Sequence, residues 1–233
     1  MRRTAWTLLT ATVAGCAAPQ VAKPPDAVVV ARGAEPEAEV DHMARAGACL
    51  DAGDSAGAVP HLTAHLAAYP DAVMIRAYLA DLHFKLGEVG KAKRHYARYV
   101  RDAAGMDGTA GKHLVHGHTR LMHIAASQED AFAESLHRGI GLVLLVRQWD
   151  AEAAPGAPEL DPLTETTLVR AAAALKVARE VAPTDPRVQV YLAEVWGRLG
   201  QPSAARAAIR TAKELLPDAA LNADERARVL RME

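Results

Sequence analysis

The sequence predicts an all-α fold in which antiparallel helix pairs stack into a solenoid behind a disordered N-terminal tether. Aromatic residues make up only 4% of the chain, and small residues, chiefly alanine, recur at helical spacing, which favours closely packed helices over sheets. Matching residue types also return after 34 positions, as expected of a repeated helical hairpin. Glycines recur where turns between the helices need positive φ: Gly53, Gly87 and Gly200.

The first 15 residues have the features of a secretory signal. Arg2 and Arg3 precede an apolar stretch of about ten residues that ends in small residues. This stretch is too short to span a bilayer, which needs about twenty apolar residues. Its end, Val13-Ala14-Gly15-Cys16, resembles the lipobox of bacterial lipoproteins. The resemblance implies cleavage before Cys16 and diacylation of its sulfur, with palmitate among the acyl groups, and more than one acyl chain gives stable attachment. The alternative is an ordinary secreted protein in which Cys16 lies near the cut by chance.

Residues 16–36 are predicted to form the tether. They contain four prolines and Gly33, and Pro-rich segments are semi-extended spacers. The run Val28-Val29-Val30 has no partner strand in the sequence, so we assign it to the tether. In Gram-negative lipoproteins, an aspartate directly after the lipidated cysteine favours retention in the inner membrane. This chain has Ala17 at that position, so the resemblance implies an outer-membrane location facing the periplasm.

From residue 37 to residue 233 the pattern is helical and repetitive. Gly53, Ala58 and Leu62 return 34 residues later as Gly87, Ala92 and Tyr96, and a better copy surrounds Gly200. These positions resemble the signature of the tetratricopeptide (TPR) family, which implies a right-handed superhelix of helix pairs. We expect Ala126 to replace the turn glycine in a divergent unit, and the second helix near Ala171 to lack a clear first helix. The predicted units are about 39–72, 73–106, 112–150, a partial unit at 163–183, 186–219, and a capping helix at 223–232.

Composition excludes several classes of function. The net charge is −1, and removal of Arg2 and Arg3 with the signal gives −3. Nucleic-acid binding needs a strongly basic face, so this charge argues against it. With Cys16 acylated, Cys49 has no partner for an intrachain disulfide. No phosphate-binding loop, nucleophile elbow or dinucleotide fingerprint is present. We therefore expect no catalytic residues, no cofactor and no small-molecule substrate.

The resemblance also implies which residues line a partner-binding groove. On the helix that begins near Lys112, histidines and an arginine at spacings of three and four form one polar stripe. In the units before and after it, the register places further side chains in the groove. The full set is Met74, Ala77, Asp81, Phe84, Lys85, His113, His116, Arg120, His123, Arg187, Glu194 and Arg198.

Two other interpretations of the histidine stripe remain open. The stripe could be a solvated helix face or a metal site. Against the metal site, His116 and His123 lie two turns apart, about 10 Å along the axis, so one ion cannot bind both. Most basic runs, such as that from Lys91 to Arg101, are only solvated as well.

These observations favour a membrane-tethered TPR lipoprotein of the bacterial cell envelope that binds an unidentified envelope protein or peptide and is not an enzyme. One alternative is a histidine-dependent metal-binding or enzymatic envelope protein. Another is a structural envelope protein that assembles with itself through its incomplete repeat ends.

Overall fold

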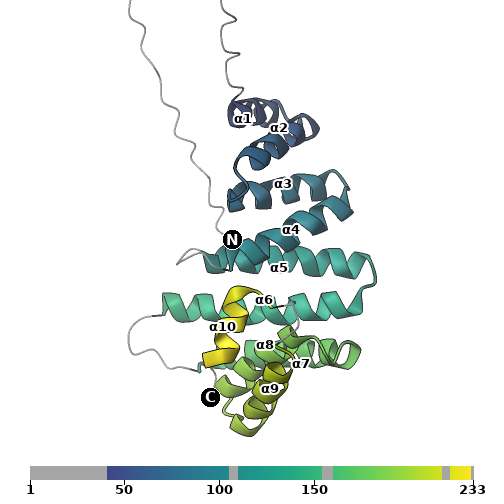
Figure 1. The fold of residues 1–233 in the computed structure, drawn as a ribbon. Helices are drawn as coiled ribbons and strands as arrows, with labels where there is room; N and C mark the ends of the chain where they lie inside the picture. The colour runs from purple at the N-terminus through teal and green to yellow at the C-terminus, as the bar shows by residue number, and fades with distance from the viewer. Residues whose placement is uncertain (1–40, 105–109, 154–159, 217–220, 232–233) are drawn as a thin grey trace, which may run out of the picture. The chain divides into compact units, whose positions relative to one another are not determined.

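The structure is a computed structural model that describes residues 41–104, 110–153, 160–216 and 221–231. Within these residues the chain is built from helices joined by short connections and contains no strand (Figure 1). The predicted all-α, TPR-like repeat fold is confirmed. The predicted signal, Cys16 and the tether with Val28–Val30 lie outside the described residues.

The described residues form ten helices. The first half contains α1 (His42–Asp51), α2 (Ser55–Ala68), α3 (Val73–Lys85), α4 (Val89–Ala103) and α5 (Ala110–Ser127). The second half contains α6 (Ala131–Glu152), α7 (Pro162–Val181), α8 (Pro186–Arg198), α9 (Pro202–Glu214) and α10 (Ala223–Arg231). None of these helices combines the length and the hydropathy that a segment needs to cross a bilayer.

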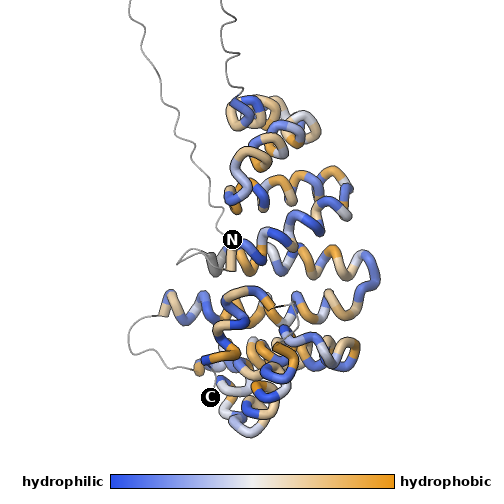
Figure 2. The backbone as a smooth tube through the Cα atoms, in the orientation of Figure 1, coloured by the Kyte–Doolittle hydropathy of each residue, from blue (hydrophilic) through white to orange (hydrophobic). Residues whose placement is uncertain are grey.

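Most helices pack as consecutive pairs. The strongest contacts of α1, α3 and α8 are with the next helix in the chain, and adjacent pairs then contact each other through α2 and α3 and through α4 and α5. Apolar residues recur along the helices (Figure 2), and many of them are buried. A helix pair cannot bury its apolar face alone, so each pair depends on the next.

The middle of the array departs from simple pairing. The long helix α6 packs extensively against both α5 and α7 and also contacts α8. The segment 163–183, which the sequence predicts to lack a clear first helix, therefore packs as α7 on a helix that already has a partner. The largest apolar cluster among the described residues, called the main apolar cluster below, includes buried residues of α6, α7 and α8, among them Ile140, Leu175 and Leu192.

The turns within the pairs share one backbone geometry. Gly53, Gly87 and Gly200 have φ of 76°, 75° and 67°, which confirms the predicted positive φ at these turns. In each turn the amide after the glycine donates to a carbonyl five residues earlier, which satisfies a free carbonyl at the helix end.

One expected turn position is wrong. Ala126 does not replace the turn glycine, because α5 continues through Ser127 and Glu129 takes the left-handed conformation, with φ of 56°. The amide of Asp130 then donates to the carbonyl of Ala125, as in the glycine turns. The prediction failed because α5 is longer than the repeat register implies.

Helix starts are marked by polar caps that the sequence supplies. Aspartates accept hydrogen bonds from amides of the first turns of α1, α2, α6, α7 and α8. At α10, Asn222 and Glu225 cap each other's amides at 2.9 Å.

Candidate partner-binding face

Asp81 on α3 is the centre of a polar cluster that joins three helices. Its Oδ1 accepts a hydrogen bond from the Tyr96 hydroxyl of α4 at 2.5 Å. The same oxygen lies 3.3 Å from His116 Nε2 and 3.4 Å from Arg120 Nε, both on α5. The structure therefore brings together three of the predicted groove residues, which come from two successive repeat units.

Tyr96 of α4 holds Asp81 in place from the buried side of the cluster. Its side chain is fully buried, and burial, followed by the hydrogen bond to Asp81, raises the pKa of the Tyr96 hydroxyl well above its usual value. The hydroxyl therefore stays protonated and donates to Asp81 at every physiological pH. The repeat signature predicts Tyr96 only as a packing residue. The signal for its polar role is a hydroxyl at a position that an apolar residue could fill.

Arg120 links the cluster to an aromatic ring. Its guanidinium carbon lies 5.4 Å from the centre of the Phe84 ring, within the range of a cation–π interaction. Phe84 is half-buried and packs against the apolar cluster of α3, α4 and α5. The guanidinium is thus held by a carboxylate and by a ring, both on α3.

Two large apolar side chains are exposed on the same helix. Met74 is 45% exposed and Tyr78 is 43% exposed. With Asp81 they lie at spacings of four and three residues, so they share one face of α3. Tyr78 was not among the predicted residues, although its spacing from Met74 indicates it. We call the surface formed by Met74, Tyr78, Asp81, Phe84, His116 and Arg120 the α3–α5 face.

Other predicted residues of these helices have different surroundings. Ala77 is buried in the main apolar cluster, and the Lys85 ammonium donates to the Ser55 hydroxyl of α2 at 2.9 Å. At the ends of the α5 stripe, His113 is half-buried and His123 is exposed. In the described residues, no group of three metal-ligating side chains is arranged to hold an ion.

The predicted groove residues of α8 do not form an open surface, which corrects the expectation for this unit. Glu194 pairs with Arg147 of α6, whose Nε lies 2.6 Å from Oε1, and with Arg228 of α10 at 3.3 Å. Arg198 forms a bidentate pair with Asp150 of α6, at 2.6 and 3.0 Å.

Helix α10 covers part of this surface. Val190 of α8 is fully buried in a cluster with Leu221 and Val229 at the C-terminal end. Arg187 lies beside Asp185 and within electrostatic range of buried Glu225. The repeat register could not predict that α10 covers these residues of α8, because α10 is not part of a repeat unit.

A polar pocket of about 400 Å³ lies beside α10. His118 of α5 and His137 of α6 meet in its wall, with their Nδ1 atoms 3.0 Å apart. Burial, then the neighbouring positive charges, lowers the pKa of His118 well below its usual value and that of His137 to about 4. The charged groups around the pair are Arg187 and Asp185 near α8, Lys93 of α4, and Asp130 before α6. Both imidazoles are therefore neutral at pH 7.

Comparison with known proteins places the fold in context. No protein-family description matches the chain, and no curated protein sequence matches it either. Among solved structures, a crystal structure of MamA is 14% identical over 76% of this chain and 90% of that one, with a TM-score of 0.40. A thermophilic TPR protein of Thermus thermophilus is 20% identical over 75% and 72%, with a TM-score of 0.33. The TPR2AB domain of yeast Sti1, in complex with pHSP90, is 16% identical over 76% of each chain, with a TM-score of 0.37. These similarities concern the type of fold alone.

The histidine pair predicts how stability depends on pH. The unfolded chain takes up protons near pH 6.5, whereas folded His137 does so only near pH 4. The stability present above pH 6.5 is therefore lost as the pH falls toward 4. We expect the free energy of unfolding to fall by about 2 kcal/mol from His137 alone between pH 7 and pH 5, and His118 adds to the loss in the same direction. Urea unfolding at both pH values checks this loss.

The matched variants are His137→Gln and His123→Gln, which change a paired and an exposed histidine. H137Q should lose less stability than the wild type on acidification, and H123Q should behave like the wild type. An unchanged loss in H137Q would show that the pair does not determine the pH dependence.

Proposed function

We propose that this protein is a membrane-tethered helical-repeat scaffold of the bacterial cell envelope that binds a protein partner through the α3–α5 face. The observation that supports the face most directly is the contact of Tyr96, His116 and Arg120 with one oxygen of Asp81. These contacts fix charged groups beside two exposed apolar side chains. Exposed apolar groups rimmed by polar ones are typical of interaction surfaces.

The chemistry of the face indicates the kind of segment that it binds. Met74 and Tyr78 offer apolar contact, while Arg120 and His116 present hydrogen-bond donors around a single carboxylate. Lys85 adds a positive charge at the end of α3. We propose an extended peptide with an apolar side chain and a carboxylate as the partner segment. Because Asp81 and Arg120 are already held in place, ordering them on binding costs little entropy.

Photocrosslinking from Tyr78 tests this face. A photoreactive phenylalanine analogue at position 78 should capture one dominant envelope protein in intact cells. The control position is Tyr69, which is 57% exposed and lies outside the α3–α5 face. Arg120→Gln should reduce capture from position 78 about threefold, because it removes one charge from the face. Equal capture from positions 69 and 78, or capture unaffected by R120Q, would contradict the proposal.

The tether is supported by the sequence Val13-Ala14-Gly15-Cys16 and by the prolines that follow it. A lipid at Cys16 would keep the repeats near the membrane and raise their effective concentration toward membrane-bound partners.

Labelling with a palmitate analogue tests the lipid. The wild-type chain should be labelled and sediment with membranes, and Cys16→Ser should lose both properties. Cys49→Ser is the control, since Cys49 is the free thiol within the helical array. An unlabelled wild type, or loss of label in C49S, would refute lipidation at Cys16.

A further inference from the structure

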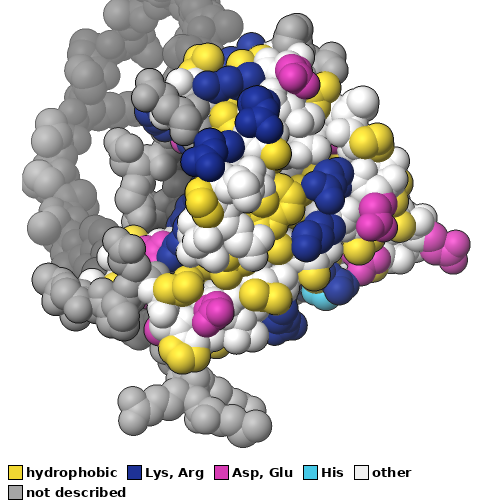
Figure 3. All heavy atoms as spheres, turned by 90° about the horizontal axis from the view of Figure 1, so that it is seen from below, with side chains coloured by type: hydrophobic (Ala, Val, Ile, Leu, Met, Phe, Trp, Pro, Cys, Tyr) yellow, Lys and Arg dark blue, Asp and Glu magenta, His cyan; other side chains and the backbone are white. Residues whose placement is uncertain are grey.

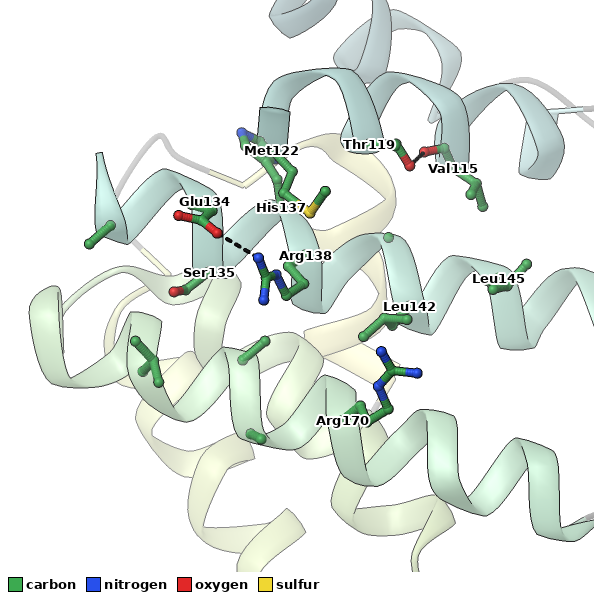
Figure 4. A pocket seen from close by; sticks show the side chains of 15 residues that line it. Val115, Thr119, Met122, Glu134, Ser135, His137, Arg138, Leu142, Leu145 and Arg170 are labelled. Carbon is green, nitrogen blue, oxygen red and sulfur yellow. Dashed lines mark hydrogen bonds and ion pairs between the residues drawn. The ribbon is translucent and has the colours of Figure 1, made fainter. Parts of the chain in front are cut away.

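A second surface of the protein is a groove over helix α6. Helices α5 and α7 both pack on α6 but make no extensive contact with each other. Between them lies a pocket of about 690 Å³ (Figure 4). Its apolar lining comes from all three helices: Val115, Met122, Leu142, Leu145, Ala173 and Val177. We call it the α6 groove. It uses a different stripe of α5 from the one that faces Asp81.

The shape of the groove suits a helix. The residues of α6 in its floor, from Ala131 to Leu145, recur at spacings of three and four and so run along one side of the helix. At 1.5 Å per residue this floor is about 21 Å long, the length of a four-turn helix. Gly141 and Ala173 carry little or no side chain, so they leave room for an incoming backbone.

The wall formed by α7 has apolar residues that its own packing leaves uncovered. Val177, which lines the groove, is 45% exposed, and Val181, one turn further along α7, is 56% exposed. Apolar side chains also lie among Lys and Arg side chains on the face of the protein that Figure 3 shows. The side chains of Val177 and Val181 stay exposed although α7 already packs on α6 and α8, so an incoming helix could bury them.

The charges at the groove favour an acidic partner. Arg138 is paired with Glu134 at 2.5 Å, as Figure 4 shows. Arg170 of α7 lines the groove and is exposed, and it has no ion-pair partner among the residues that the structure describes. A carboxylate on the incoming helix would therefore meet an available guanidinium.

We propose that the α6 groove binds an amphipathic helix of a protein partner. Its apolar side chains lie on Leu142, Leu145 and Val177, and an acidic side chain pairs with Arg170. Anchors spaced by three and four residues are the usual mode of helix-in-groove recognition. This inference does not depend on the α3–α5 face, so failure of either proposal leaves the other standing.

The test uses the full chain with Cys16→Ser and two designed peptides of about sixteen residues. Both peptides carry leucines at helical spacing; one has glutamates and the other lysines beside the leucine stripe. Binding is measured by fluorescence anisotropy. We expect the glutamate peptide to bind about threefold more tightly or better, and Arg170→Glu to reverse this preference. Ala173→Trp, which fills the groove, should weaken binding of the glutamate peptide about tenfold.

The matched control is Ala207→Trp, which places the same ring on an exposed position of α9 and should leave binding unchanged. Circular dichroism checks the folding of each variant, and R170E tests the proposal even if A173W is unstable. A charge preference unaffected by R170E would overturn the proposal. So would self-association that A173W abolishes, which would identify a second copy as the occupant. Binding of a fluorescent fatty acid that A173W abolishes, with no binding of the glutamate peptide, would overturn it as well.

Discussion

The close contact between Gly139 of α6 and Leu175 of α7 sets the spacing of the central helices. A Cβ atom on Gly139 would lie 2.5 Å from Leu175 Cγ, and one on Gly117 of α5 would lie 2.6 Å from Val100 Cγ1 of α4. Glycine therefore allows these helices to approach until the side chain of one rests on the backbone of the other. Because each helix buries its apolar face only against its neighbours, this spacing determines how the main apolar cluster closes. The exposed surfaces used for binding are positioned by the same packing.

Helix α6 explains the irregular middle of the sequence. It packs on α5 and on α7 and so takes part in two layers, which removes the need for a separate first helix before α7. This sharing has a structural consequence: α5 and α7 stand on either side of α6, and one side of α6 remains as the floor of a groove. The departure from the repeat and the proposed second binding surface thus have the same origin.

The repeat register was sufficient to predict an all-α repeat fold and the three glycine turns, since these follow from spacing along the chain. It placed Asp81, His116 and Arg120 in one groove but did not predict that they contact one another. It could not predict what depends on tertiary packing. Glu129 takes the place of a turn glycine because α5 runs longer than the register allows. Glu194 and Arg198, predicted as groove residues, are paired with residues of α6 and α10 that lie far from them in sequence. The role of Tyr96 as a donor to Asp81 required the positions of the side chains.

The most direct test of this account compares Gly139→Ala with Gly141→Ala by equilibrium urea unfolding. Both replacements lie within α6, but a Cβ atom on Gly141 would meet only His118 Cβ, at 3.7 Å. Alanine is favoured over glycine in a helix by about 0.5–1 kcal/mol, so G141A should be neutral or stabilising. G139A should destabilise the protein by about 1–2 kcal/mol, because overpacking against Leu175 outweighs the gain in helix propensity. Equal stability of the two variants would contradict the claim that close packing of α6 on α7 organises the fold.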